Sequence, residues 1–111
     1  MDILRMTRRQ HGDLVVVSLM GEVDVDNVSQ VRECLDEAAS APRPRLVVDL
    51  TGLTFIDTTG LGVLVRLLAT LRERNGTMAL VAPDGQVLRR LRRTNLAPLF
   101  PIYDTLSQAL T

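Results

Sequence analysis

Two adjacent threonines after an aspartate are the residues of this sequence best placed to do chemistry. They stand in the run Asp57-Thr58-Thr59-Gly60, between a short apolar stretch and a long helical pattern of leucines. Up to four backbone N–H groups lack intrahelical partners at a helix start, so Asp57 or Thr58 can serve as the N-cap. A cap requires only one of these side chains. A threonine hydroxyl that the cap does not need is accessible to a kinase, and the helix dipole favours a phosphate formed on it.

Groups that would support catalysis are missing from the sequence or stand in the wrong places. Gly60-Leu61-Gly62 begins like a dinucleotide-binding fingerprint, but Val65 occupies the third glycine position. The chain has no lysine, which a phosphate-binding loop needs. Its one histidine, His11, has no Cys or carboxylate at the spacing of a zinc site. We therefore expect no catalytic residue, no metal and no cofactor.

Composition and charge exclude several classes of partner. The 111 residues carry 13 basic and 13 acidic side chains, and every basic one is an arginine, so no net charge attracts nucleic acid or an anionic membrane. No apolar run approaches the ~20 residues of a membrane span. We expect a cytoplasmic protein that neither binds nucleic acid directly nor inserts into a membrane.

One local cluster of charge interrupts this balance. Arg89, Arg90, Arg92 and Arg93 surround the apolar side of a helical pattern. Such an arrangement is typical of a solvated amphipathic face, and the alternative is a docking surface for an acidic partner.

The elements that must position the threonines alternate between strands and helices. Residues 46–50 form a short apolar run, which is typical of a central strand buried on both faces. The predicted strands are 3–9, 14–20, 46–50, 55–56, 77–81 and 99–103, and the predicted helices begin near residues 25, 61, 86 and 104. This alternation predicts one α/β domain over residues 1–111.

Side chains at the helix ends suggest where the helices begin and stop. Asp24 or Asp26 stands before the first helix, Gly76 after the second and Asp104 before the last, and each is suited to capping. Cys34, the single cysteine, lies on the apolar side of the first helical pattern and is expected to be a buried thiol.

Three stretches of the chain carry a resemblance to a known family. They are LVVDLTGLTFIDTTGLGVLV at 46–65, Gly21-Glu22-Val23-Asp24, and residues 94–104. Together they resemble the STAS-domain family, the anti-sigma factor antagonists of bacteria, in which a D-S/T-S/T-G-L-G segment follows the third strand. The resemblance implies an α/β STAS fold, with a four- to five-stranded mixed sheet and helices packed mainly on one face.

The resemblance also implies a function. Members of this kind bind an anti-sigma factor that is a serine/threonine kinase with a histidine-kinase-like ATP-binding fold. The unphosphorylated antagonist sequesters that kinase and frees the sigma factor. Phosphorylation of the hydroxyl directly after the signature aspartate, here Thr58, breaks the complex, and a metal-dependent serine/threonine phosphatase resets it. Thr59 is the alternative acceptor. The alternative function is a constitutive STAS subunit of a stress-sensing scaffold or of a lipid-transport ABC complex.

The resemblance further implies which residues meet the partner. Asp24 lies near the acceptor and contributes to recognition by the kinase, Asp57 shapes the site, and Gly60 and Gly62 let the helix start approach the partner closely. The full predicted partner-binding set is Asp24, Asp57, Thr58, Thr59, Gly60, Leu61 and Gly62.

Overall fold

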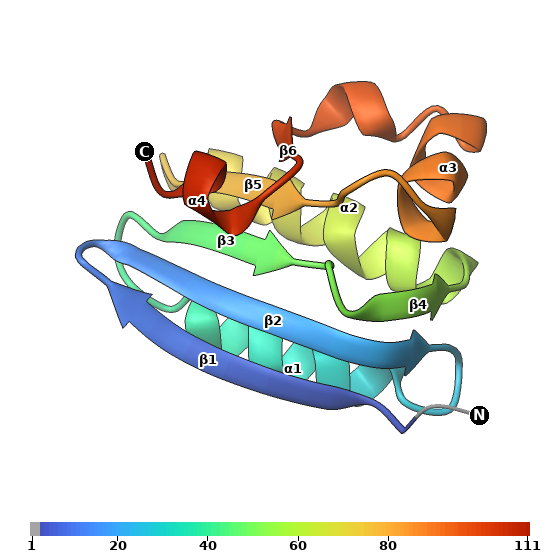
Figure 1. Cartoon of the computed structure of the whole chain (residues 1–111). Helices are drawn as coiled ribbons and strands as arrows, with labels where there is room; N and C mark the ends of the chain where they lie inside the picture. The colour runs from blue at the N-terminus through green and yellow to red at the C-terminus, as the bar shows by residue number, and fades with distance from the viewer. Residues whose placement is uncertain (1–2) are drawn as a thin grey trace.

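The computed structural model describes residues 3–111, and each predicted strand and helix has a counterpart in it (Figure 1). The strands are β1 (Arg5–His11), β2 (Leu14–Val23), β3 (Arg45–Asp49), β4 (Leu53–Ile56), β5 (Thr77–Val81) and β6 (Ile102–Tyr103). The helices are α1 (Val28–Ala38), α2 (Thr58–Glu73), α3 (Gln86–Arg93) and α4 (Leu106–Ala109), with a 3-10 turn at Ala97–Leu99.

The strands form a mixed sheet with β3 at its centre, as the apolar run at 46–50 predicts. Its order is β1-β2-β3-β5-β6, with β1 antiparallel to β2 and the later pairs parallel. β4 lies off this path and pairs with the last residues of β2. The sheet thus has six strands rather than the expected four or five. The reason is that β2 is long enough to pair with β3 along its first half and with β4 at its end.

Alternation of side chains along the strands divides the core into two unequal parts. Val15 and Val17 of β2 pack in the larger cluster, to which α1, α2 and α3 contribute. Val16, Val47 and Val81 point to the other face of the sheet and pack against α4. The α/β class and the packing of helices mainly on one face are therefore confirmed (Figure 1).

Gly21 lets β2 change its pairing partner. The register of β2 with β4 shifts between Gly21 and Glu22, and Gly21 has a φ of +100°, which only glycine adopts without strain. A Cβ there would lie 2.4 Å from the backbone oxygen of Ile3. The Gly21 N–H donates to the Gly52 carbonyl at 3.1 Å, which holds the turn before β4 against β2.

The cap of α1 differs from the sequence expectation. Asn27, not Asp24 or Asp26, occupies the N-cap position. The Asp24 carboxylate accepts instead from the Asp26 N–H at 2.9 Å, and the Asp24 carbonyl accepts from the Val28 N–H at 2.9 Å. The Asp24 side chain therefore stabilises the turn before the helix and does not cap the helix.

The ends of two other helices also differ. Asn75, with a φ of 57°, takes the left-handed position after α2 that was expected for Gly76. Thr105, not Asp104, caps α4, because its hydroxyl accepts from the Gln108 N–H while the Gln108 side chain accepts from the Thr105 N–H. This reciprocal capping box satisfies two N–H groups at the start of the helix.

Two further expectations are corrected. β6 begins at Ile102 rather than at residue 99, because Pro98 lies in the first turn of the preceding 3-10 helix, where its fixed φ is favourable. Cys34 is half-buried rather than buried, and burial together with the nearby Glu37 raises the pKa of its thiol.

Helix α2 is fixed to the sheet by the leucines of its helical pattern, whose periodicity already predicts one buried face. Leu61, Leu64 and Leu68 are 2%, 1% and 5% exposed. We expect Leu64→Ala to lower the free energy of unfolding by ~2–5 kcal/mol, because it removes a buried side chain and leaves a cavity. Leu99→Ala, at a leucine that is 39% exposed, is the matched control and should cost much less. Urea unfolding measures both changes. A loss below about half a kcal/mol for Leu64→Ala, small for any core truncation, would mean that this helix face is wrongly assigned.

Candidate functional site

The two polar stretches that the sequence singles out meet where β2 and β4 end. These strands run parallel, with Val23 opposite Ile56, so their carboxyl ends lie at the same edge. The Asp57 N–H donates to the Val23 carbonyl at 3.1 Å, and the Val25 backbone hydrogen bonds to the Asp57 carboxylate. The loop that contains Asp24 therefore lies beside the start of α2, although more than thirty residues separate the two in the sequence.

Asp57 organises the start of α2. It occupies the N-cap position with extended backbone, and its carboxylate accepts from the Gly60 N–H at 3.0 Å and from the Thr59 hydroxyl at 2.5 Å. Partial burial acts to raise the pKa of Asp57, but these bonds and those from the Thr59 and Val25 backbone outweigh it and lower the pKa. The carboxylate is therefore ionised near neutral pH and holds the helix start in place.

The two threonines differ in their surroundings. Both are exposed, but the Thr59 hydroxyl is bound to the Asp57 carboxylate. The Thr58 hydroxyl makes no hydrogen bond to any residue within 3–111. Thr58 thus presents an unengaged hydroxyl at the first residue of α2, whereas Thr59 would first have to break a bond.

The glycines and the leucine of the predicted partner-binding set face different ways. Gly60 is buried, and a Cβ there would lie 2.6 Å from a side-chain carbon of Ile56 and 2.8 Å from one of Val23. Leu61 is 2% exposed and belongs to the core. Gly62 is exposed, and a Cβ there would meet nothing within 4 Å. Gly60 therefore allows α2 to approach β2 and β4 rather than a partner, and only Gly62 of these three faces outward.

The loop after β2 is rigid and presents acidic and apolar groups. Asn27 connects its two ends, because its side-chain oxygen accepts from the Asp24 N–H at 3.0 Å and its amide donates to the Glu22 carbonyl at 2.9 Å. Val25 is 67% exposed next to Asp24. The sequence did not single out Asn27 or Val25. An asparagine directly before a helical pattern was the signal for the first, but a lone exposed valine gives none.

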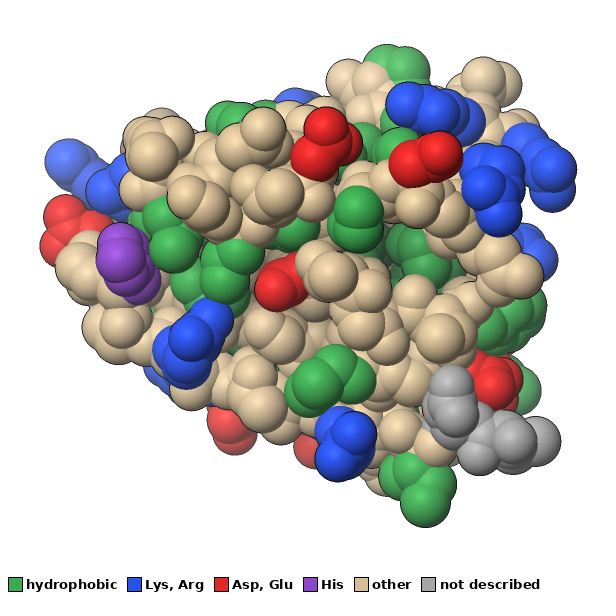
Figure 2. Space-filling model, viewed as in Figure 1, with side chains coloured by type: hydrophobic (Ala, Val, Ile, Leu, Met, Phe, Trp, Pro, Cys, Tyr) green, Lys and Arg blue, Asp and Glu red, His purple; other side chains and the backbone are tan. Residues whose placement is uncertain are grey.

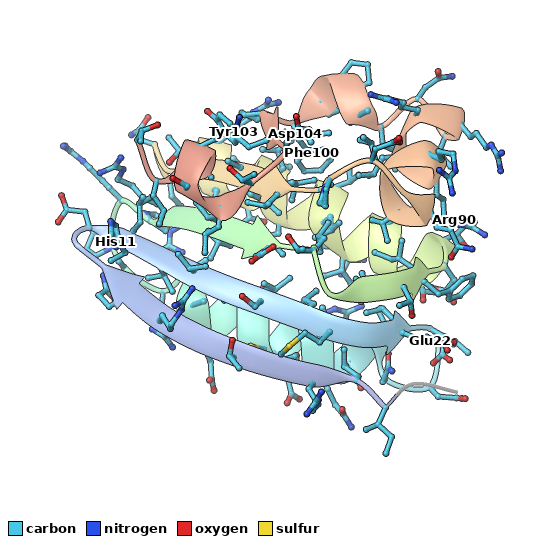
Figure 3. All side chains as sticks on the ribbon, viewed as in Figure 1. His11, Glu22, Arg90, Phe100, Tyr103 and Asp104 are labelled. Carbon is cyan, nitrogen blue, oxygen red and sulfur yellow. The ribbon has the colours of Figure 1, made fainter. Side chains whose placement is uncertain are left out.

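Helix α3 is basic and lies at the same end of the molecule as the site. Figure 3 shows Arg90 and Glu22 at the end where β2 and β4 finish, with His11 at the opposite end of the β1–β2 hairpin. The Arg90 guanidinium lies 5.4 Å from the centre of the Phe55 ring. Phe55 comes two residues before Asp57 in the sequence. Sequence reasoning identified the arginines but missed Phe55, which it assigned only to a short strand.

Within residues 3–111, no three His, Cys, Asp or Glu side chains come together as a metal ion would require. In that same part of the chain, none of the helices is both long and apolar enough to cross a membrane.

Comparison with known proteins agrees with this fold. The model of the STAS domain matches residues 5–109, and the chain belongs to that family. An anti-sigma F factor antagonist of Paenibacillus polymyxa is 32% identical, over 97% of this chain and 93% of the relative. The crystal structure of an anti-sigma factor antagonist from Mycobacterium paratuberculosis superposes with a TM-score of 0.88 at 28% identity, covering 98% of this chain and 92% of that one.

A more distant solved structure shares the fold. The Bacillus cell fate determinant SpoIIAA in its phosphorylated form superposes with a TM-score of 0.72, over 97% of this chain and 96% of that one. Its sequence identity of 21% supports a likeness of fold only. The predicted STAS fold is therefore confirmed.

The cap at Asp57 should depend on pH. We expect Asp57→Ala to lower the free energy of unfolding by ~0.5–2 kcal/mol near neutral pH, because Gly60 and Thr59 lose their acceptor. Asp57→Asn keeps an acceptor and should lose less. The folded pKa is lowered below the unfolded value of ~3.9, so the contribution of the charge is present above that value and lost as the pH falls through the folded pKa.

The measurement is urea unfolding at about pH 7 and about pH 2.5. The difference between the parent and Asp57→Ala should narrow at the lower pH, because the carboxylate becomes protonated. Asp26→Ala, in the neighbouring loop, is the control, since no side-chain hydrogen bond of Asp26 is present within residues 3–111. An equal loss at both pH values would show that the charge on Asp57 does not stabilise α2.

Proposed function

We propose that this chain is an anti-sigma factor antagonist controlled by phosphorylation of Thr58. In its unphosphorylated form it binds an anti-sigma factor that is a serine/threonine kinase with a histidine-kinase-like ATP-binding fold, and so frees the sigma factor in the cytoplasm. Phosphorylation releases the kinase, and a metal-dependent serine/threonine phosphatase restores the antagonist. The observation that carries the proposal is the exposed, unengaged hydroxyl of Thr58 beside the Asp57 cap. The relatives named as anti-sigma factor antagonists support it.

Thr58 is favoured over Thr59 as the acceptor for two reasons. A kinase must orient the attacking oxygen, and the Thr58 hydroxyl is free to rotate, whereas that of Thr59 donates to Asp57 at 2.5 Å. A phosphate on Thr59 would also lose this hydrogen bond and stand against the Asp57 carboxylate, so that like charges repel.

The fold can carry a phosphate on Thr58, but with little gain. The Thr59 and Gly60 N–H groups already bond to the Asp57 carboxylate. The phosphate therefore meets chiefly the helix dipole, worth ~0.3–1 kcal/mol, and this is offset by repulsion from Asp57. The solved structure of SpoIIAA in its phosphorylated form supports the view that this fold tolerates a phosphate.

A bound partner would not tolerate the same group. A standard interface buries ~1,200–2,000 Å² of surface, and a phosphate inside it brings a charge of about −1.5 to −2 that must lose water. An uncompensated loss of ~2.8 kcal/mol already weakens affinity a hundredfold. Phosphorylation should therefore act on binding and not on folding.

The outward-facing members of the predicted set form the proposed contact surface. They are Asp24, Asp57, Thr58, Thr59 and Gly62, while Gly60 and Leu61 support it from within. Asp24 and Asp57 place negative charge beside the acceptor, which favours a partner that presents basic side chains there.

The proposal is tested with purified kinase-type anti-sigma factors from the organism that carries this gene. We expect Thr58→Glu to keep its melting temperature within a few degrees of the parent and to bind the cognate kinase at least a hundredfold more weakly. Thr58→Ala should bind like the parent but should not be released when ATP is added. Calorimetric titration with and without ATP measures both effects.

Thr59→Ala is the matched control, because it alters the neighbouring hydroxyl and should still be phosphorylated and released. If Thr58→Ala is phosphorylated and released like the parent, the acceptor is not Thr58. If no anti-sigma factor binds the parent in either state, the chain acts as a constitutive subunit and the proposed function is wrong.

A second prediction concerns nucleotide. In the proposed mechanism ATP is bound by the kinase, so the isolated antagonist should neither bind ATP with micromolar affinity nor hydrolyse it. Calorimetry and a phosphate-release assay on the purified chain measure this, with its kinase as the positive control. Saturable ATP binding that persists through repeated purification would contradict the proposal.

A further inference from the structure

A groove between β4 and α3 is lined in part by Phe55 and Ile56, which come just before Thr58 in the chain. Neither Thr58 nor the Asp57 cap lines it. Its volume is about 310 Å³. Its lining combines an apolar floor with a basic wall and consists of Phe55, Ile56, Gln86, Val87, Arg89, Arg90, Arg93 and Thr94. Figure 2 shows basic side chains gathered at this end of the molecule, although the chain as a whole has no net charge.

The arginines of the groove have no counter-ion among the described residues. No carboxylate within residues 3–111 forms an ion pair with Arg89, Arg90 or Arg93. Arg90 lies over the ring of Phe55, which is itself 36% exposed, and this contact holds the guanidinium at the edge of the floor. A solvated amphipathic helix does not need an exposed aromatic ring beneath its cations. The exposed ring of Phe55 therefore distinguishes the groove from an ordinary solvated surface.

This groove lies within reach of a partner that covers Thr58. A standard interface buries about 800 Å² on each partner, which corresponds to a patch of roughly 16 Å radius. Phe55 stands three residues before Thr58, so the chain places it at most about 11 Å away. The floor of the groove therefore lies within the radius of a standard interface centred on the acceptor.

The charges inside that interface determine what the partner must present. A buried guanidinium without a counter-ion is strongly unfavourable, so the segment over Arg89, Arg90 and Arg93 has to be acidic. The floor at Phe55 favours an apolar side chain between the acidic ones. On the other side of Thr58, Asp24 and Asp57 favour basic side chains. An interface with two opposite charges on its two sides admits the partner in one orientation only.

We propose that the groove between β4 and α3 binds an acidic segment with an apolar side chain, contributed by the same anti-sigma factor that acts on Thr58. This inference rests on the proposed function and adds the second contact that orients the kinase.

Single charge reversals on α3 test the proposal against the cognate anti-sigma factor. At 150 mM NaCl, Arg89→Glu and Arg93→Glu should each weaken binding at least tenfold, and the double variant at least a hundredfold. Arg92→Glu is the matched control, because Arg92 is exposed on the same helix but does not line the groove. It should stay within threefold of the parent.

The salt dependence of binding distinguishes the basic wall of the groove from its apolar floor. The effects of Arg89→Glu and Arg93→Glu should shrink in 500 mM NaCl, where exposed charges are screened over a few ångströms. Phe55→Ala should weaken binding about tenfold at both salt concentrations, because its contact is apolar. Thermal melts of every variant verify folding, and Arg89→Gln and Arg93→Gln replace any variant that melts early.

The outcomes distinguish this inference from the proposed function. If the anti-sigma factor binds the parent and is released through Thr58, but Arg89→Glu and Arg93→Glu bind like Arg92→Glu, the groove is wrongly assigned and the switch stands. If the double variant loses affinity for double-stranded DNA and keeps its affinity for the anti-sigma factor, the groove binds phosphate backbones and the inference is overturned. If no anti-sigma factor binds the parent, both proposals fail together.

Discussion

The site depends on the parallel pairing of β4 with the last residues of β2. This pairing sets Val23 opposite Ile56 and allows the Asp57 N–H to donate to the Val23 carbonyl at 3.1 Å. It also defines where α2 begins and where the loop with Asp24 lies. Gly21 changes the register of β2 just before this point. The position of the whole site therefore depends on a backbone conformation that only glycine adopts easily.

Asp57 converts this arrangement of strands into chemistry. One carboxylate caps α2, holds the Thr59 hydroxyl and contacts the Val25 backbone. The consequence is an asymmetry between two adjacent threonines, one engaged and one free. The same carboxylate limits how much the helix start can stabilise a phosphate, because it already occupies two of the N–H groups. The proposed phosphorylation of Thr58 should therefore change the stability of the fold little and the affinity for a partner strongly.

The surroundings of Thr58 differ in charge from one side to the other. Acidic groups lie toward the loop after β2, and arginines with an exposed aromatic ring lie toward α3. The chain as a whole has no net charge, so this local separation, and not a long-range field, must select and orient a partner. This separation of charge gives a small domain a physical basis for specificity toward one partner.

The sequence by itself determined the class of fold, the order of the elements, the burial of the α2 leucines and the family, because periodicity and short motifs are local properties. It also placed Asp57 and Thr58 at a helix start. Only the tertiary structure decided that Thr59 is engaged and Thr58 free, that Gly60 faces inward, and that Phe55 lies under Arg90. Each of these depends on which distant segment lies alongside, and that follows from the pairing of β2 with β4 and the packing of α3 beside β4, which no local pattern encodes.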